Sequence, residues 1–360
     1  MKTEMKSTEA LTLLGICPND YAWIDVRSEG ENLDGFIPGF HSIPILNNQE
    51  RVLVGTTYKK EGQQKAIELG HSLVRDSKNI RVDSWESLIK QSKTQTAIVN
   101  CWRGGLRSKT ACEWLNERNI KSIRIEGGYK ALRGELLEQL GQLPKLIVLS
   151  GLTGSGKTRL LNKYKSRALD LEFHAHHRGS TFGIQIRGEQ PRQATFENKI
   201  LFDLYQKRFE LLIEDESIRI GQVQIPKILK EKMRASPVVW IDAELSERVE
   251  WIAQEYVIDL IKKGFESAEI MKKLEQSLLL LTKKLGYALT TELRRELIKA
   301  FETNPLDSLS HIAWIEPLLT CHYDKLYDYS FKKFPRTVIF KGKPKECEQW
   351  IQNKFDLPKP

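Results

Sequence analysis

No stretch of this 360-residue chain approaches the roughly 18 consecutive apolar residues that a membrane-spanning helix needs. The most apolar run, residues 278–281, is short and is soon followed by Lys283 and Lys284. Residues 1–14 are mixed in charge and lack the long apolar segment of a secretory signal. We therefore expect a cytoplasmic protein with no membrane partner.

Cysteine is scarce, and its placement argues against a disulfide framework. The chain has five cysteines, an odd number, scattered and without the spacing of metal ligands. A chain of this size in a reducing compartment does not depend on disulfides. Cys17 and Cys112 lie in apolar or helical surroundings and are expected in the core. Cys101 stands among glycines and arginines, so it is the cysteine for which we expect a chemical role.

Internal repeats, low-complexity tracts and long flexible linkers are also missing, which favours closely packed domains. The length permits two domains with separate cores. The net charge is +9, from 56 basic residues (Lys and Arg) and 47 acidic residues (Asp and Glu). The residues after 143 hold 36 of the basic and 29 of the acidic residues. This surplus is compatible with binding RNA or DNA phosphates but does not require it.

Strand-like and helix-like segments alternate along the chain, the order typical of α/β domains with parallel sheets. We predict two such domains, over residues 12–138 and over residues 144–360, the second with a helical extension. The segments that carry this prediction are strands at 21–26, 96–100, 121–125, 145–150 and 238–241, helices from 106, after 127–128 and near 159–165, and mostly helical sequence over 244–302.

A cysteine begins a glycine- and arginine-rich loop directly after the strand predicted at 96–100. Backbone N–H groups converge in such a turn, and together with a following helix and nearby arginines they favour a thiolate. The thiolate is the nucleophilic form of cysteine, so we predict that Cys101 is catalytic. Trp102 either packs over the loop or offers a face to an unstacked RNA base. The predicted residues of this chalcogen loop are Cys101, Trp102, Arg103, Gly104, Gly105 and Arg107.

Two chemistries use such a loop: carriage of a transferable sulfur or selenium atom, and attack on a phosphate monoester. Four separated motifs favour the first chemistry. They closely resemble motifs of the rhodanese family of sulfurtransferases and occur in the same order as in that family, over about residues 12–136. The resemblance implies a persulfide or selenopersulfide on Cys101. The Asp25–Arg27 pair is expected to brace the sheet and loop. The motifs are Asp-Val-Arg-Ser at 25–28, the segment 35–44, the Cys101 loop and Glu-Gly-Gly-Tyr at 126–129.

The Cys101 loop departs from this resemblance in its length. Five residues separate Cys101 from Arg107, whereas many single-domain rhodaneses have four. The longer loop resembles that of the cell-cycle phosphatases that share the rhodanese fold, and it suits a larger donor such as selenophosphate equally well. A phosphatase activity therefore stays open on this feature.

A second phosphate-binding loop, Gly-Leu-Thr-Gly-Ser-Gly-Lys-Thr at 151–158, matches the P-loop motif at every defined position and lies between a predicted strand and helix. Its glycines let backbone N–H groups turn inward. The lysine supplies positive charge to phosphate oxygens, and the threonine hydroxyl can coordinate Mg²⁺. The predicted phosphate-binding residues are Gly151, Gly154, Ser155, Gly156, Lys157 and Thr158.

No site held by protein metal ligands is predicted. Asp242, Asp170 and Glu172 are alternatives for an acidic residue that holds a P-loop metal ion through water. A dense polar cluster lacks standard zinc spacing, and we expect it to contact phosphates or RNA or to hydrogen-bond locally. Its members are His174, His176, His177, Arg178 and Ser180.

The two loops in one chain look like the tRNA 2-selenouridine synthase family, a resemblance that spans nearly the whole chain. It implies replacement of sulfur by selenium at the 2-position of the wobble uridine of tRNA, with selenophosphate as donor and Cys101 carrying the selenium. The family is also associated with S-geranylation of 2-thiouridine by geranyl diphosphate. The further matching segments are 171–172, 177–183, 196–198, 214–217, 220–221 and 238–241.

The resemblance implies a transferase that acts on tRNA, with selenophosphate and geranyl diphosphate as co-substrates and a selenophosphate-supplying enzyme as a partner. Lys157 and an Mg²⁺ ion on Thr158 would neutralise a diphosphate leaving group, so we expect the P-loop to bind geranyl diphosphate. One alternative is an RNA or small-molecule kinase with a sulfurtransferase or phosphatase domain. Another is an RNA-binding regulator with a nucleotide switch. The basic helices after residue 244 are either solvated faces or tRNA contacts.

Overall fold

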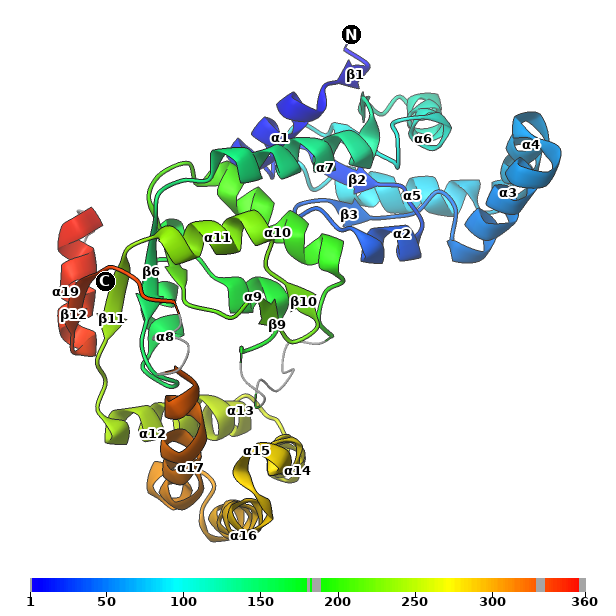
Figure 1. The fold of residues 1–360 in the computed structure, drawn as a ribbon. Coiled ribbons are helices and arrows are strands. Elements are labelled where there is room, and N and C mark those ends of the chain that lie inside the picture. The colour runs from blue at the N-terminus through cyan, green and yellow to red at the C-terminus, as the bar shows by residue number, and fades with distance from the viewer. Residues whose placement is uncertain (1, 180–181, 183–188, 328–333, 356–360) are drawn as a thin grey trace. The chain divides into compact units, whose positions relative to one another are not determined.

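The computed structural model describes residues 2–179, 182, 189–327 and 334–355 (Figure 1). Their contacts divide the chain into two compact units, Met1–Gln142 with Arg192–Gln206, and Leu143–Pro191 with Lys207–Pro360. Each unit is built on its own five-stranded parallel sheet, which confirms the predicted α/β class. Among the described helices, none is long and apolar enough to span a membrane.

The first unit has the strand order β1-β5-β4-β2-β3. The strands are β1 (Glu4–Met5), β2 (Ala22–Asp25), β3 (His41–Ser42), β4 (Ala97–Asn100) and β5 (Ser122–Ile125). The helices are α1 (Ser7–Ile16), α2 (Glu29–Asp34), α3 (Asn48–Glu61), α4 (Gln63–Val74), α5 (Lys78–Ile89), α6 (Leu106–Glu117), α7 (Gly128–Glu138), the short η1 (Gln139–Gln142) and α10 (Gln193–Gln206).

The central strands β2 and β4 of this unit are buried on both faces, as parallel strands between helices are. Ile24 and Val99 join a core cluster with Trp85 of α5 and Trp114 of α6, whose rings stack with centroids 6.1 Å apart. Side chains alternate along a strand, so Trp23 points to the opposite face, where α1 and α7 pack together. This two-sided core fixes the carboxyl end of β4, where Cys101 follows.

The contact units differ from the predicted ranges 12–138 and 144–360 in two places. The first unit begins before residue 12 because β1 pairs with β5. It also includes α10, which the prediction assigned to the second domain. Arg133 of α7 donates a hydrogen bond to Asn198 of α10 at 2.6 Å and pairs with Glu197, so α10 is tied to α7 by both charge and hydrogen bonding.

The second unit has the strand order β12-β11-β6-β8-β7 and a separate antiparallel pair, β9 with β10. The strands are β6 (Leu146–Ser150), β7 (Ala168–Leu169), β8 (Leu211–Glu214), β9 (Arg219–Ile220), β10 (Val223–Gln224), β11 (Val238–Ile241) and β12 (Val338–Gly342). The helices with the sheet are α8 (Lys157–Lys163), η2 (Lys165–Arg167), α9 (Leu171–Ala175), α11 (Lys227–Ala235) and α19 (Pro344–Phe355).

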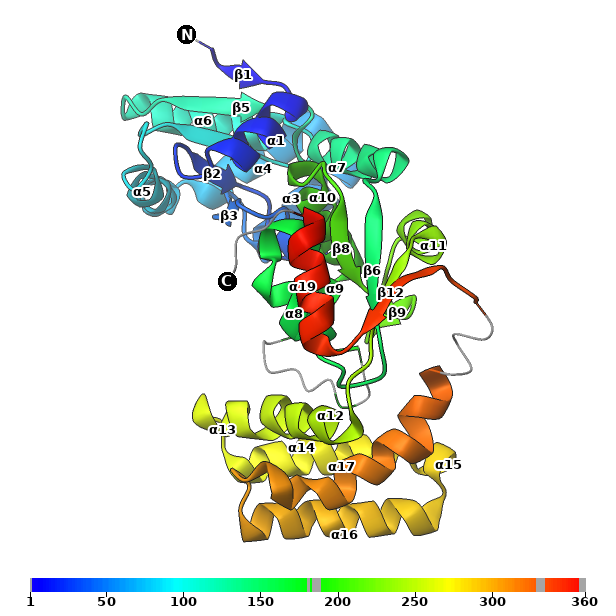
Figure 2. The same cartoon turned by 90° about the vertical axis from the view of Figure 1, so that its left-hand side faces the viewer.

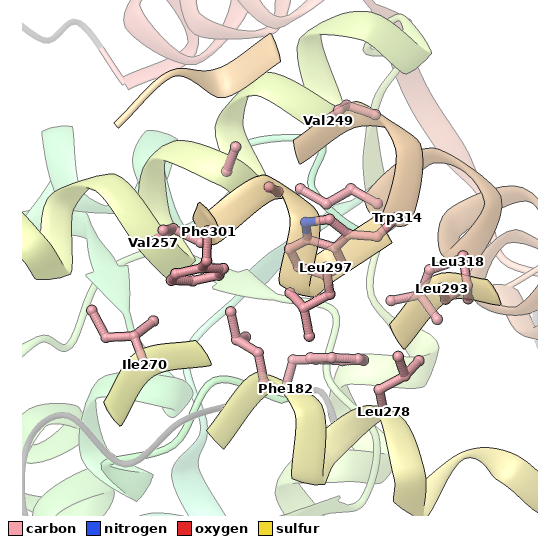
Figure 3. Packing of buried hydrophobic residues seen from close by; sticks show 14 of the residues in the cluster. Phe182, Val249, Val257, Ile270, Leu278, Leu293, Leu297, Phe301, Trp314 and Leu318 are labelled. Atoms are coloured by element: carbon pink, nitrogen blue, oxygen red, sulfur yellow. The ribbon is translucent and has the colours of Figure 1, made fainter. Parts of the chain in front are cut away.

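A helical part within this unit has its own apolar core (Figures 2 and 3). Leu274 and Leu278 of α14 belong to one cluster with Leu293 and Leu297 of α16, and Trp314 of α17 completes it. The helices are α12 (Leu245–Ala253), η3 (Gln254–Ile258), α13 (Asp259–Lys262), α14 (Ser267–Leu280), α15 (Thr282–Leu285), α16 (Tyr287–Thr303), η4 (Ser308–His311), α17 (Ile312–Leu318) and η5 (Leu319–Tyr323).

Candidate functional site

Cys101 lies at the carboxyl end of β4 and is almost fully buried. Its Sγ is 3.2 Å from the hydroxyl oxygen of Ser108, in the first turn of α6. Its carbonyl oxygen accepts a hydrogen bond from the Tyr129 N–H of α7 at 2.8 Å. The sulfur is therefore held beside a hydroxyl and at the start of α6, a position that favours negative charge.

Two glycines let the cysteine loop lie directly against the start of α7. Gly104 has φ +63°, and a Cβ there would lie 2.4 Å from the Ile125 carbonyl oxygen. Gly128 has φ +58°, and a Cβ there would lie 2.2 Å from the Cys101 carbonyl oxygen. Backbone meets backbone at both places, so a larger residue would displace the loop that carries Cys101.

Arg107 is a fixed cation beside this loop. It donates to both carboxylate oxygens of Glu31, with Nη2 and Oε1 3.0 Å apart. Burial alone would lower the pKa of Arg107, but the bond and charge of Glu31, and the charges of Cys101 and Asp25, outweigh it and raise that pKa. Burial would likewise raise the pKa of Glu31, yet Arg107 holds it below its ordinary value. Both groups stay charged near neutral pH.

The predicted Asp25–Arg27 ion pair is present and buried, with Nη2 and Oδ2 2.7 Å apart. Beyond it, the guanidinium of Arg27 lies 3.9 Å from the ring centroid of Tyr129. Trp102 stacks on the same Tyr129 ring with 5.3 Å between centroids, and the Arg27 guanidinium is also 6.0 Å from the Trp102 ring centroid. Trp102 is 39% exposed and Arg103 is exposed, so Trp102 packs over the loop and also presents surface to solvent.

The P-loop occupies the turn between β6 and α8 in the second unit. Gly151, Gly154 and Gly156 all have positive φ, and Cβ atoms there would approach Ile241, Ile252 and Trp251 respectively.

Lys157 Nζ donates to the Gly151 carbonyl at 2.8 Å and faces the Tyr327 ring at 5.2 Å. Ser155 Oγ is buried and has no hydrogen-bond partner among the described residues. One of the predicted phosphate-binding residues therefore has a buried hydroxyl that could donate a hydrogen bond to a phosphate oxygen.

Three glutamates surround this lysine. Glu172 Oε2 accepts from the Thr158 hydroxyl at 3.3 Å, and Glu172 Oε1 accepts from the Gly179 N–H at 2.6 Å. Glu214 accepts from the Glu172 N–H at 2.8 Å. Burial and the charge of Asp170 raise the pKa of Glu172. Burial and the charge of Glu172 raise the pKa of Glu214, and raise that of Glu216 to about 8. Burial lowers the pKa of Lys157, although the carboxylates oppose this.

A cavity of about 530 Å³ extends from the P-loop into the helical part. Its lining combines polar groups, among them Lys157, Thr158, Glu172 and Glu216, with apolar and aromatic side chains. The apolar lining comes from Phe182, Trp251, Ile252, Trp314, Ile315, Leu318, Leu319, Leu326 and Phe334. Several of these belong to the core shown in Figure 3. The cavity therefore joins the P-loop to an apolar chamber formed by these side chains.

A family model described as the tRNA 2-selenouridine synthase AAA domain matches residues 144–357. The chain belongs to the tRNA 2-selenouridine synthase family. A protein of that name from Shewanella woodyi is 38% identical over 347 residues, 92% of this chain and 93% of the relative. One from Aeromonas salmonicida is 38% identical over 346 residues, 91% of this chain and 92% of the relative. The family resemblance of the sequence motifs is thereby confirmed.

The chain is also similar to a solved rhodanese-like domain protein from Staphylococcus aureus. The identity is 21%, the match covers 37% of this chain and 91% of the other chain, and the TM-score is 0.22.

The three acidic residues considered for a P-loop metal ion lie in different surroundings in this family member. Asp242 is exposed, pairs with Lys341 at 3.1 Å and does not line the cavity, so its strand position does not bring it to the P-loop. Asp170 caps α9 by accepting from the Phe173 N–H at 2.7 Å. Glu172 lies beside Thr158. Among the described residues, no group of three or more His, Cys, Asp or Glu could hold a metal ion.

The members of the polar cluster after Leu171 lie in different surroundings in the structure. His176 ends α9 with φ +51°, and burial lowers the pKa of His177. Arg178 lines the cavity and donates to the Glu255 carbonyl oxygen at 3.0 Å. Ser180, and Thr181 and Gly183 of the matching segment, lie outside the described residues.

Basic side chains that were not predicted from the sequence also line the cavity. Asp215, at the end of β8, accepts from Ser150 at 2.7 Å and from Arg336 at 2.8 Å. Arg336 lowers the pKa of Asp215 against the effect of burial. Lys230 of α11 donates to the Glu216 carbonyl oxygen. The apolar run Leu-Leu-Ile before Glu214 was a usable signal for β8, whereas no local motif marks Lys230 or Arg336.

Proposed function

We propose that this chain is a tRNA 2-selenouridine synthase, which exchanges sulfur for selenium at the 2-position of a wobble uridine in the cytoplasm. The observation that carries the proposal is membership of a family whose relatives bear that name and align over more than nine-tenths of the chain. The Cys101 geometry supports it, because a buried sulfur beside a hydroxyl and a fixed arginine is suited to anionic chemistry.

Selenophosphate is the proposed donor, received from a partner enzyme that makes it. The Cys101 thiolate first exchanges with a low-molecular-weight disulfide, the oxidant of this step, to give a mixed disulfide. The selenium of selenophosphate then attacks the Cys101 sulfur, so that the S–Se bond forms as the S–S bond breaks and the small thiol leaves, and water cleaves the Se–P bond and releases phosphate. The selenium then bonds to C2 of the uridine as the sulfur substituent departs, and a thiol reductant cleaves the S–Se bond. The loop arginine, Arg107, supports the anionic sulfur and selenium in these steps.

Geranyl diphosphate is the proposed ligand of the P-loop. Its two phosphates match the buried Ser155 hydroxyl and Lys157, and its ten-carbon chain matches the apolar chamber. The sulfur of 2-thiouridine bonds to C1 of the geranyl group, the C1–O bond breaks and diphosphate leaves. The S-geranyl group is then a better leaving group for the selenium step.

Mg²⁺ fits the polar part of the lining of this cavity, since oxygen donors and substrate phosphates are its usual ligands. Thr158 and Glu172, whose side chains meet at 3.3 Å, would hold the ion. It would add positive charge against the departing diphosphate.

Mass spectrometry of tRNA nucleosides tests the proposal. The cells lack the native gene and express either the wild-type protein or a variant in its place. We expect Cys101→Ser to abolish 2-selenouridine and leave the geranylated nucleoside, and Lys157→Ala to lower the geranylated nucleoside at least tenfold. Cys112→Ser is the matched control, because burial raises the pKa of Cys112 to about 11 and keeps it a neutral thiol.

Unchanged nucleosides in Cys101→Ser cells would refute the selenium assignment. Nucleotide turnover that depends on Lys157 and ignores Cys101, with geranylation intact in Lys157→Ala, would favour the kinase alternative.

A further inference from the structure

Trp102, the residue after Cys101, combines packing with exposure. Its ring stacks on Tyr129 with centroids 5.3 Å apart and planes inclined by 27°. Yet 39% of the residue is accessible. Because Tyr129 covers one face of the indole, the accessible surface includes ring that Tyr129 does not cover, on the residue that follows Cys101 in the chain.

The side chains that pack against Trp102 are themselves held in place by other contacts. Tyr129 is buried and so close to the Gly35 backbone that a Cβ on Gly35 would lie 1.9 Å from the Tyr129 hydroxyl. Asn198 donates to that hydroxyl at 3.2 Å. Arg27 lies against the Tyr129 ring and is held by Asp25. An aromatic surface ordered in advance loses little conformational freedom when a flat ligand binds.

Trp102 and Cys101 are also held together. The Tyr129 N–H donates to the Cys101 carbonyl oxygen at 2.8 Å, and the Lys130 N–H donates to the Trp102 carbonyl oxygen at 3.1 Å. Consecutive residues of α7 therefore hold consecutive residues of the loop. A ligand stacked on Trp102 would lie at a constant position relative to the sulfur.

Positive charge flanks this aromatic surface. Arg103 and Lys130 are both exposed. Arg103 follows Trp102 in the chain, and the Lys130 N–H donates a hydrogen bond to the Trp102 carbonyl oxygen. Unpaired bases stack on tryptophan, while arginine and lysine bind the phosphates on either side. An aromatic platform, two exposed cations and a nucleophile make up a site for one splayed-out nucleotide.

We propose that Trp102 is the platform on which the target pyrimidine of the tRNA stacks, so that its 2-position faces Cys101, while Arg103 and Lys130 contact the flanking phosphates. The inference rests on the proposed function, because it names how the RNA substrate of that same site is bound. Trp102 is a positioning residue here, and Cys101 remains the nucleophile.

The test uses the full chain and two anticodon stem–loop RNAs, one with 2-thiouridine at the wobble position and one with an abasic site there. We expect Trp102→Ala to raise the Kd for the thiouridine RNA about tenfold or more, the range of base–aromatic stacking. Trp102→Phe should raise it by less than about threefold. All variants should bind the abasic RNA equally. Tyr58→Ala, which removes an exposed aromatic ring from α3 in the same unit, is the control and should change neither Kd.

A second readout separates positioning from folding. Loading of selenium onto Cys101, followed by mass spectrometry of the intact protein, should be unchanged in Trp102→Ala, whereas the KM for RNA should rise.

Equal loss of affinity for both RNAs, or impaired selenium loading in Trp102→Ala and Trp102→Phe alike, would show that the ring only packs the loop and would overturn the inference. Wild-type Kd values in Trp102→Ala would overturn it too. Failure of the wild type to bind or selenate the thiouridine RNA would instead overturn the proposed function.

Discussion

Two cysteines eleven positions apart show how environment decides reactivity at the scale of the residue. Cys112, within α6, is partly buried, and burial raises the pKa of its thiol to about 11. Cys101 is more deeply buried, but its sulfur lies beside the Ser108 hydroxyl. The charge of Cys101 also helps to raise the pKa of Arg107. At Cys112 the hydrogen bond with Ser122 offsets only part of the effect of burial on the thiol pKa.

The Glu31–Arg107 pair gives a prediction at this scale. Replacing Glu31 with Gln removes the charge that fixes Arg107, so we expect a loss of about 1–3 kcal/mol of unfolding free energy at pH 7. The folded-state pKa of Glu31 lies below its ordinary 4.5, so its contribution is present above about pH 4.5 and disappears as the pH falls through the lowered value. Urea unfolding from pH 7 to pH 4 measures the difference.

The control for this prediction is Glu113→Gln, since Glu113 pairs with Lys109 only at 3.9 Å on the surface. It should cost less than about 0.5 kcal/mol. A Glu31→Gln penalty that does not shrink towards pH 4 would contradict the electrostatic account.

At the scale of the element, the start of α7 holds the cysteine loop by backbone contact. We expect Gly128→Ala to destabilise the protein by about 2–4 kcal/mol and to slow alkylation of Cys101, because its Cβ would meet the Cys101 carbonyl oxygen and the Gly104 nitrogen. Denaturant unfolding and the alkylation rate, followed by mass spectrometry, measure both effects.

Gly134→Ala, in the same helix, is the matched control. A Cβ there meets nothing within 4 Å, so alanine should stabilise α7 by about 0.5–1 kcal/mol through its helix propensity. If both alanine variants behaved alike, close packing of α7 on the loop would not be what positions Cys101.

At the scale of the whole molecule, the net charge of +9 predicts salt-dependent RNA binding. We expect log Kd for tRNA to rise linearly with log[KCl], with a slope of about 0.7–0.9 for each phosphate neutralised. Because the charge surplus lies after residue 143, replacing Lys283 and Lys284 of α15 with Gln should lower the slope by about 1.4–1.8. Fluorescence anisotropy measures the slope.

The matched control replaces Lys59 and Lys60, exposed at the end of α3 in the first unit, and should leave the slope unchanged. The opposite result, a slope lowered by the α3 pair alone, would assign the α15 lysines to a solvated face.

Much of the fold follows from local patterns in this chain. The predicted helix start at Leu106 and strand 238–241 agree with α6 and β11, because a glycine turn and an apolar run bounded by polar residues mark them. The helix α10 lies within the predicted range 144–360, which the family model also spans, but its contacts group it with the first unit, because its hydrogen bond with Arg133 of α7 joins positions more than 60 residues apart. Periodicity carries no information about such distant pairing.

The amino-acid sequence by itself determined both loops, since each is a contiguous run whose glycines, charges and nucleophile act within a few residues of backbone. Tertiary structure alone decided which distant side chains serve them: Glu31 for Arg107, Tyr129 and Arg27 beneath Trp102, Glu216 and the apolar chamber beside Lys157. The physical reason is range. Backbone conformation is set by near neighbours, whereas burial, ion pairing and cavities arise only when packing brings separate elements together.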